Sequence, residues 1–293
     1  MTRNLFDLTP EQAAYESARV AVLPVPYDGT ATYRKGSALG PEALIEASCQ
    51  VETFDEDTGA SLEPIGIHLL RAVEEGGDPA DVVERVAAAT QRVLSDGKFP
   101  VGLGGDHTAV TAGMVRAVIE SGQKPLSALV IDAHLDLRES YEGSRFNHAC
   151  NTRRLLDLGA EVLTVGARSW SAEEERVRQE HGLDPVQARW INEGEVTAEA
   201  IVERLGETVY LSIDLDGLDP AVVPAVGTPE PGGLSWQFVV DLIAVLCAQR
   251  TVIAADIVEL CPLPGDIRGD FAAARLLAKL LSHRLGHASP RVG

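Results

Sequence analysis

The chain has 293 residues, and 25 Lys and Arg against 44 Asp and Glu give a formal net charge of −19 at pH 7. Hydrophobic residues make up 45% and charged residues 24%, which is typical of a globular protein and excludes bulk disorder. The acidic balance disfavours nucleic acid as a partner, because nucleic-acid-binding surfaces are basic. The four cysteines form no Cys-x-x-Cys pair, which fits a reducing compartment.

No segment has the length and hydropathy of a membrane span. The start of the chain carries no continuous apolar run, and the best apolar window near the other end, residues 238–248, contains Asp241. That window is about half as long as a spanning helix. We therefore expect a cytoplasmic protein without membrane contact.

Apolar runs alternate with amphipathic stretches along the chain. In chain order, the pattern predicts a strand at 19–23, a long polar loop at 24–40, helices at 41–47 and 79–95, a strand at 99–103, a helix at 108–121, a strand at 126–131, a helix at 152–158, a strand at 162–165, helices at 172–179 and 197–205, a strand at 208–213, a helix at 236–248, a strand at 252–258 and a helix at 271–285.

The expected strands are continuous Val, Ile and Leu runs rather than alternating ones, which is typical of a parallel sheet covered on both faces. An α/β fold can hold a chain of this length in one domain. We expect a single domain over residues 1–293, in which 1–17 form an N-terminal extension and 287–293 a flexible tail.

Polar residues that carry chemistry follow the ends of these strands. In parallel α/β sheets, ligands bind outside the carboxyl ends of the strands. Five carboxylates and two imidazoles are expected to meet there, namely Asp132, Asp136, Asp214, Asp216, Glu259, His107 and His134. So much buried negative charge is costly unless cations neutralise it. Oxygen ligands with two histidines suit Mn²⁺, with Mg²⁺, Fe²⁺ or Zn²⁺ as alternatives, and they are numerous enough for two bridged ions.

Competing catalytic motifs are missing. Residues 102–107 begin like a dinucleotide-binding fingerprint, but His107 stands where the third glycine belongs. The chain has no Gly-x-Ser-x-Gly elbow and no P-loop. Metal-dependent chemistry is therefore favoured over nucleotide binding or serine hydrolysis.

Five motifs resemble those of the ureohydrolase family, which includes arginases and agmatinases. They are GGDH at 104–107, DAHLD at 132–136, the SxDxD segment ending in GTPEPGG at 212–233, DIVELCP at 256–262 and the loop and helix at 24–48. The resemblance extends from about residue 20 to residue 281. It implies a three-layer α/β/α sandwich with a largely parallel eight-stranded sheet, two Mn²⁺ per subunit, and assembly as trimers or hexamers.

The resemblance also implies roles for individual residues. The first ion would be held by His107, Asp132, Asp136 and Asp214, and the second by Asp132, His134, Asp214 and Asp216, so that Asp132 and Asp214 bridge. Asp136 would orient the hydroxide that attacks the guanidinium carbon, and Glu259 would pair with the guanidinium group. His148 would supply the proton to the leaving amine. Thr228 and Arg138 are further candidates for substrate contact.

The substrate is expected to be a small cationic guanidino compound. The GTPEPGG segment resembles that of agmatinases, and the Asn and Ser with which arginases hold an α-carboxylate are not found. These features favour hydrolysis of agmatine to putrescine and urea over arginase activity. Two alternatives stay open: 4-guanidinobutyrate, whose carboxylate would pair with Arg138 or Arg145 if these are not paired with Glu139 or Glu142, and aminopropylagmatine, whose distal amine would meet surface acids.

A catalytically silent relative that serves as an oligomer partner is a further alternative of a different class. Such a protein is expected to have lost metal ligands. Here all six metal positions are present, together with Glu259 and His148. The complete set favours an active enzyme.

Overall fold

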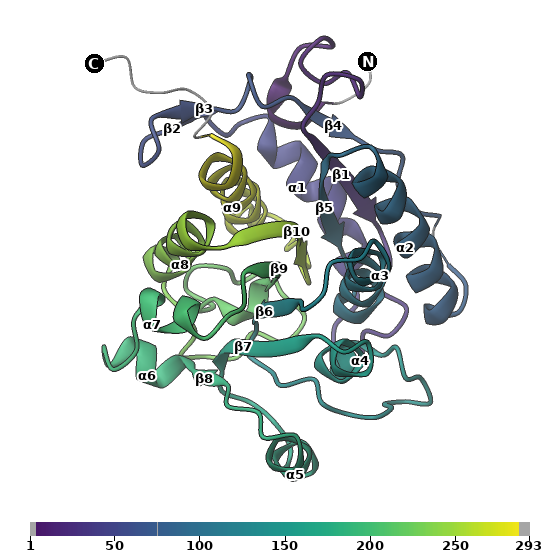
Figure 1. Ribbon diagram of the computed structural model, residues 1–293, viewed down its shortest axis with the longest axis vertical. Coiled ribbons are helices and arrows are strands. Elements are labelled where there is room, and N and C mark those ends of the chain that lie inside the picture. The colour runs from purple at the N-terminus through teal and green to yellow at the C-terminus, as the bar shows by residue number, and fades with distance from the viewer. Residues whose placement is uncertain (1–3, 75, 287–293) are drawn as a thin grey trace.

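The computed structural model describes residues 4–74 and 76–286. Within them, eight strands form one sheet in which every pairing is parallel (Figure 1). In spatial order the strands are Ile67–Leu69 (β4), Val20–Val25 (β1), Phe99–Gly104 (β5), Thr251–Val258 (β10), Thr208–Asp214 (β9), Ser127–Ile131 (β6), Glu161–Ala167 (β7) and Val186–Gln187 (β8). A separate two-stranded hairpin pairs Phe54–Asp55 (β2) with Ala60–Ser61 (β3).

Helices cover both faces of the sheet. The α-helices are Gly40–Ser48 (α1), Pro79–Ser95 (α2), His107–Glu120 (α3), Asn151–Asp157 (α4), Ala172–Glu180 (α5), Ala188–Asn192 (α6), Ala198–Glu203 (α7), Trp236–Gln249 (α8) and Arg268–Leu285 (α9). Side chains of α2, α3 and α4 share one apolar core with Val130 of β6. Those of α1, α7, α8 and α9 share the other with Ile131. Consecutive strand residues therefore enter opposite cores.

This arrangement confirms the expected three-layer α/β/α sandwich and explains the continuous apolar strands, because both faces of each central strand are buried. All six predicted strands are present, with ends shifted by up to two residues, and the predicted helices are found as well. The edge strands β4 and β8, the hairpin and α6 were not anticipated from the pattern. They are too short to show a periodicity.

The segment expected to be an N-terminal extension packs on the core where it is described. Leu5 and Phe6 are buried, and the Phe6 amide donates a hydrogen bond to Ser48 Oγ at 3.1 Å. The expected tail at 287–293 lies outside the described residues, and the single-domain boundaries stay a prediction. No helix in the described part of the chain is long and apolar enough to cross a membrane.

Glycines at the end of β5 allow the neighbouring loop to approach the sheet closely. A Cβ atom on Gly105 would lie 2.3 Å from the Tyr27 carbonyl oxygen and 3.0 Å from the Ala38 amide nitrogen. Both are backbone atoms, so no side-chain rotation relieves the clash. The Gly105 amide also donates to the Val25 carbonyl at 3.2 Å. The loop after β1 is thereby held against the start of α3, where His107 lies.

Substituting Gly105→Ala is expected to lower the free energy of unfolding by about 1–3 kcal/mol, because the added methyl group must displace backbone. Gly227→Ala is the matched control, since its Cβ would lie 3.5 Å from the nearest atom, the Arg34 carbonyl oxygen. Chemical denaturation of both variants in the presence of a chelator measures the difference. Equal stability of the two variants would contradict the proposed close packing.

Candidate metal centre and active site

The sheet order explains why polar residues distant in sequence meet at one place. The strands β5, β10, β9 and β6 are consecutive neighbours in the sheet. His107 begins α3 just after β5, Asp132 follows β6, Asp214 ends β9 and Glu259 follows β10. Because all four strands are parallel, their carboxyl ends lie at the same edge. The predicted ligands therefore converge at the middle of the sheet, as expected.

A first group surrounds the Nδ1 atom of His107. That nitrogen lies 3.1 Å from Asp214 Oδ2, 3.3 Å from Asp132 Oδ2 and 3.7 Å from Asp136 Oδ2. His107, Asp132 and Asp214 each offer a ligand atom within 4.8 Å of the others, and all three are buried. This arrangement can hold a metal ion.

A second group lies beside the first and shares Asp132 with it. His134 Nδ1 is 3.1 Å from Asp216 Oδ2 and 3.5 Å from Asp132 Oδ1. These three residues again bring their ligand atoms within 4.8 Å of one another. The two groups together form a candidate binuclear metal centre in which Asp132 belongs to both ligand groups. Asp136, expected as a ligand of the first ion, is near His107 but belongs to neither group, and Asp214, expected to bridge the two ions, belongs to the first group alone.

Backbone amides orient the carboxylates. The His134 amide donates to Asp132 Oδ1 at 2.6 Å, and the Asp216 amide donates to Asp214 Oδ1 at 2.9 Å. Each bond joins residues i and i+2 just past a strand, a turn that Asp favours. The Ala133 amide donates to Asp216 Oδ1 at 3.1 Å and so links the loops after β6 and β9.

The charges at this edge are unbalanced without cations. Burial raises the pKa of Asp214 well above its usual range, and the charges of Asp216 and Asp132 raise it further. Burial and the charge of Asp132 act in the same way on the pKa of Asp136. Burial alone would lower the pKa of His107, but Asp132 and Asp214 raise it well above the ordinary value.

Two buried atoms in the first group make no hydrogen bond, namely His107 Nδ1 and Asp132 Oδ2. Buried polar atoms without partners are uncommon and call for an explanation. A divalent cation between them would accept a lone pair from each and neutralise the carboxylates. The donor set therefore fits the binuclear metal site that the motifs predict.

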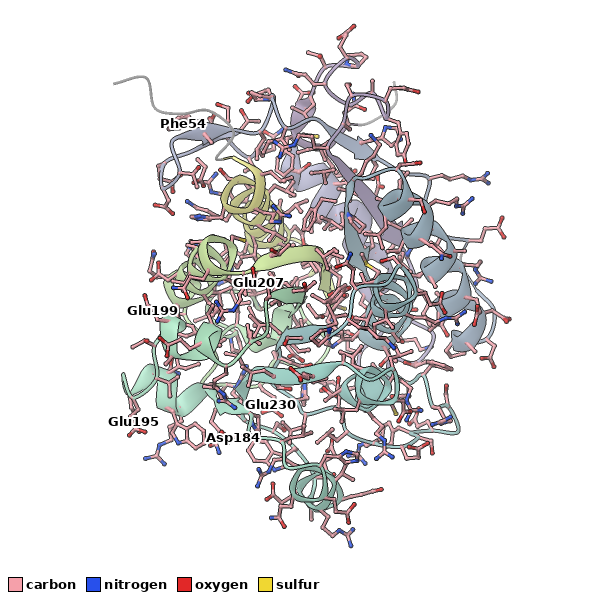
Figure 2. All side chains as sticks on the ribbon, in the orientation of Figure 1. Phe54, Asp184, Glu195, Glu199, Glu207 and Glu230 are labelled. Atoms are coloured by element: carbon pink, nitrogen blue, oxygen red, sulfur yellow. The ribbon has the colours of Figure 1, made fainter. Side chains whose placement is uncertain are left out.

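Several exposed acidic side chains are not part of this site. Glu195, Glu199 and Glu207 are exposed, and they project near α6, α7 and the start of β9 (Figure 2). Such charges are solvated by water. The net charge of −19 thus does not itself indicate metal binding.

A cavity of about 220 Å³ opens above the two groups. Its lining includes Glu259, His148, Thr228 and Arg138, all of which the sequence predicted. Aromatic side chains of Tyr33, Tyr141 and Trp170 line it as well. The predicted substrate-binding residues are therefore brought together with the candidate ligands.

Glu259 is held at the end of β10 by an unusual backbone conformation. Its φ is +64°, in the left-handed region that non-glycine residues rarely adopt. Its Oε1 accepts a hydrogen bond from the His107 amide at 2.9 Å. Burial raises the pKa of Glu259 well above its usual range, and the nearby charge of Asp214 adds to this effect. Strain of this kind is often found where a side chain must point into a site.

His148 stands on the loop between β6 and α4. Its amide donates to Thr30 Oγ1 at 2.8 Å, and its Nε2 lies 3.1 Å from Thr32 Oγ1. Burial lowers the pKa of His148 to about 4, and the charge on His134 contributes. The imidazole is therefore neutral near pH 7 and free to exchange a proton through its ring nitrogens.

The two arginines differ in position. Arg138 lines the cavity, where its Nη2 lies 3.8 Å from Glu174 Oε2 and its guanidinium carbon lies 4.6 Å from the centre of the Tyr141 ring. Arg145 is exposed and pairs with Glu139 at 2.7 Å and with Asp157 at 3.2 Å. The expected pairing with Glu139 is thus found for Arg145, whereas Arg138 faces a carboxylate that the sequence did not suggest.

Sequence reasoning missed several residues of the site. For Thr228, which the sequence did suggest, it missed the hydrogen bond that the hydroxyl donates to Asp216 Oδ2 at 3.2 Å. Thr32 and Trp170 line the cavity, and so does Glu174, which is buried and closes a capping box with Ser171. The long polar loop at 24–40 was the signal for Thr32. The capping box could be recognised in sequence, but nothing in it indicates a site.

Comparison with known proteins identifies the family. The family model described as "Arginase family" matches residues 18–283. The chain is 38% identical to an N(1)-aminopropylagmatine ureohydrolase of Synechocystis sp., over 92% of this chain and 90% of that protein. It is 33% identical to an agmatinase of Pyrococcus horikoshii, over 97% of each. The structure of agmatine ureohydrolase of Thermoplasma volcanium superposes with a TM-score of 0.85 at 36% identity, over 93% of this chain and 92% of the other. The chain therefore belongs to the arginase family of ureohydrolases.

Proposed function

We propose that this chain is a binuclear manganese hydrolase that releases urea from N(1)-aminopropylagmatine and leaves the corresponding triamine. The observation that carries the proposal is the pair of buried ligand groups sharing Asp132, in a chain of this family. Agmatine, which the sequence motifs favoured, is the second candidate. Assembly as trimers or hexamers stays a prediction.

Mn²⁺ suits the predominance of carboxylate oxygens with two imidazole nitrogens. His107, Asp132 and Asp214 would hold one ion, and His134, Asp132 and Asp216 the other. Bound divalent ions lower the pKa of water and so supply a nucleophile near neutral pH. Asp136, whose carboxylate lies beside the first group, would accept a hydrogen bond from that nucleophile.

The remaining polar residues act on the substrate. The Glu259 carboxylate faces the cavity and would bind the planar guanidinium through charge-assisted hydrogen bonds, which fixes the electrophilic carbon beside the metal groups. His148 reaches the same cavity with a neutral imidazole, so it would first take up a proton at a ring nitrogen and then give it to the departing amine.

Two observations favour the longer substrate over agmatine. The relative at 38% identity is named for N(1)-aminopropylagmatine, whereas the agmatinase is at 33%. The cavity also has Tyr33, Tyr141 and Trp170 in its lining, and aromatic faces attract the additional ammonium group that an aminopropyl arm brings. A carboxylate substrate such as 4-guanidinobutyrate is less favoured, because Glu174 and Tyr141 already contact Arg138.

The substrate assignment predicts that the Mn²⁺-loaded protein has a kcat/KM for N(1)-aminopropylagmatine at least about tenfold above that for agmatine. Urea release is measured in parallel with both compounds, 4-guanidinobutyrate and arginine. A higher kcat/KM for agmatine would show that agmatine, the second candidate, is the substrate. A preference for 4-guanidinobutyrate would make Arg138 the carboxylate partner. If none of the four compounds releases urea while two ions are bound, the proposed metal centre would stand and the proposed substrate class would be refuted.

Substituting Glu259→Gln is expected to lower kcat/KM about 100-fold or more while both ions stay bound. The amide loses the charge that binds the guanidinium, but its oxygen can still accept the His107 amide hydrogen bond. Glu193→Gln is the control, because it alters an exposed glutamate paired with Arg189 at 2.8 Å. Loss of metal from the Glu259 variant, or normal turnover, would refute the role assigned to this residue.

The shared position of Asp132 predicts different metal contents for two similar variants. Asp132→Asn is expected to lose both ions, since each group depends on this carboxylate, whereas Asp216→Asn is expected to lose only the ion beside His134. Elemental analysis after dialysis against Mn²⁺ gives the number of ions per chain. Two ions retained by the Asp132 variant would contradict the proposed centre.

A further inference from the structure

A buried carboxylate outside the metal groups lies behind His107. Asp256 is in the interior of β10, where it is paired in register with Ser212 of β9 and Gly102 of β5. Residues paired across neighbouring strands point to the same face of the sheet. Gly102 leaves room for its neighbours, since a Cβ atom there would lie 2.6 Å from Met114 Sδ, 2.8 Å from Val110 Cγ1 and 3.2 Å from Asp256 Cβ.

Three hydroxyl groups donate hydrogen bonds to Asp256. Ser212 Oγ donates to Oδ1 at 2.7 Å, Thr111 Oγ1 donates to Oδ2 at 2.7 Å, and the Tyr210 hydroxyl also donates to Oδ2. All four side chains are completely buried. Burying a carboxylate in such a place costs considerable free energy, so a structural or functional reason for it is expected.

The Ser212 hydroxyl also contacts the far side of His107. Ser212 Oγ lies 2.9 Å from His107 Nε2, the ring nitrogen opposite the one that faces Asp132 and Asp214. A hydroxyl has only one hydrogen to donate. Since that hydrogen goes to Asp256, the serine can offer His107 only a lone pair, and Nε2 must carry the hydrogen of that contact.

A second neighbour of the same nitrogen is an amide, which becomes an acceptor when its two terminal atoms are exchanged. Asn151 Nδ2 lies 2.8 Å from His107 Nε2, and the buried Asn151 Oδ1 makes no hydrogen bond. A half-turn of the amide exchanges these two atoms, so that Oδ1 accepts from Nε2–H and is no longer without a donor. Both neighbours of Nε2 then act as acceptors.

We propose that Asp256 and Ser212 form a relay that positions His107 as a metal ligand. The carboxylate fixes the direction of the serine hydroxyl, the hydroxyl accepts the Nε2 hydrogen, and Nδ1 is left with its lone pair directed at the first ligand group. Carboxylates that act on the outer nitrogen of a ligating histidine fix its tautomer and strengthen it as a ligand. Here a serine stands between the two. Asp256 is therefore a positioning residue rather than a ligand.

The relay is expected to affect one ion and not the other, because of the two candidate ligand histidines only His107 is connected to it. Among the described residues, His134 has no hydrogen bond or ion pair with Ser212 or Asp256. Disruption of the relay should therefore weaken the ion beside His107 and leave the ion beside His134 unchanged. A general loss of packing would affect both ions, or neither.

The inference rests on the proposed metal centre and is tested by titrating Mn²⁺ into the metal-free protein, with calorimetry and the electron paramagnetic resonance signal of free Mn²⁺ as readouts. The wild-type chain is expected to bind two ions. Ser212→Ala is expected to weaken one of them by about 10–100-fold. Ser48→Ala is the matched control, since it removes another completely buried hydroxyl, bonded to the Phe6 amide and the Ile45 carbonyl, and should change neither affinity.

A second variant tests the connection between the two residues. Asp256→Asn is expected to weaken the same ion, and the double variant Ser212→Ala/Asp256→Asn should be no worse than Ser212→Ala alone, because the relay is already broken. Thermal unfolding of each variant verifies that it is folded.

The outcomes separate the two proposals. Two ions bound by wild type, with equal affinities in Ser212→Ala, would overturn the relay alone. Additive effects of the two substitutions would overturn it as well, since they would show independent roles. A wild-type chain that binds no Mn²⁺ would overturn both the proposed function and the relay.

Discussion

The concentration of buried carboxylates at one edge of the central sheet is the constraint on which the rest of the site depends. Asp132, Asp136, Asp214 and Asp216 are all buried there, beside two imidazoles. A cluster of this kind is unfavourable in a low-dielectric interior unless cations enter it. The proposed metal binding would therefore stabilise the folded protein as well as serve its chemistry.

The fold holds these groups in place through contacts that few residue types can make. Gly102 and Gly105 stand where a neighbouring side chain or loop comes too close for a Cβ atom. Asp136 and Glu259 have φ values of +51° and +64°, which are unfavourable for residues with a Cβ. Their persistence requires that packing and hydrogen bonds around them offset the strain, as the His107 amide does for Glu259.

The sequence predicted the central strands and the candidate ligands because both follow from strong local patterns. The long apolar runs marked six strands, and the DAHLD and SxDxD segments placed Asp132 and Asp214 at strand ends. It could not predict β4 and β8, which are three and two residues long and are defined by pairing with a neighbour. Nor could it connect Asp256 with His107, since that contact depends on the register of β9 and β10.

The interposed serine has a physical advantage over direct contact between Asp256 and His107. A further carboxylate touching the imidazole would add negative charge within reach of the metal groups, where burial and neighbouring charges already raise the pKa values of Asp214 and Asp136. The Ser212 hydroxyl transmits orientation without bringing that charge closer. Tyr210 and Thr111 also stabilise the buried Asp256 carboxylate, because each donates a hydrogen bond to it. The centre can thus have a rigid, correctly protonated histidine while its charge stays matched to two divalent ions.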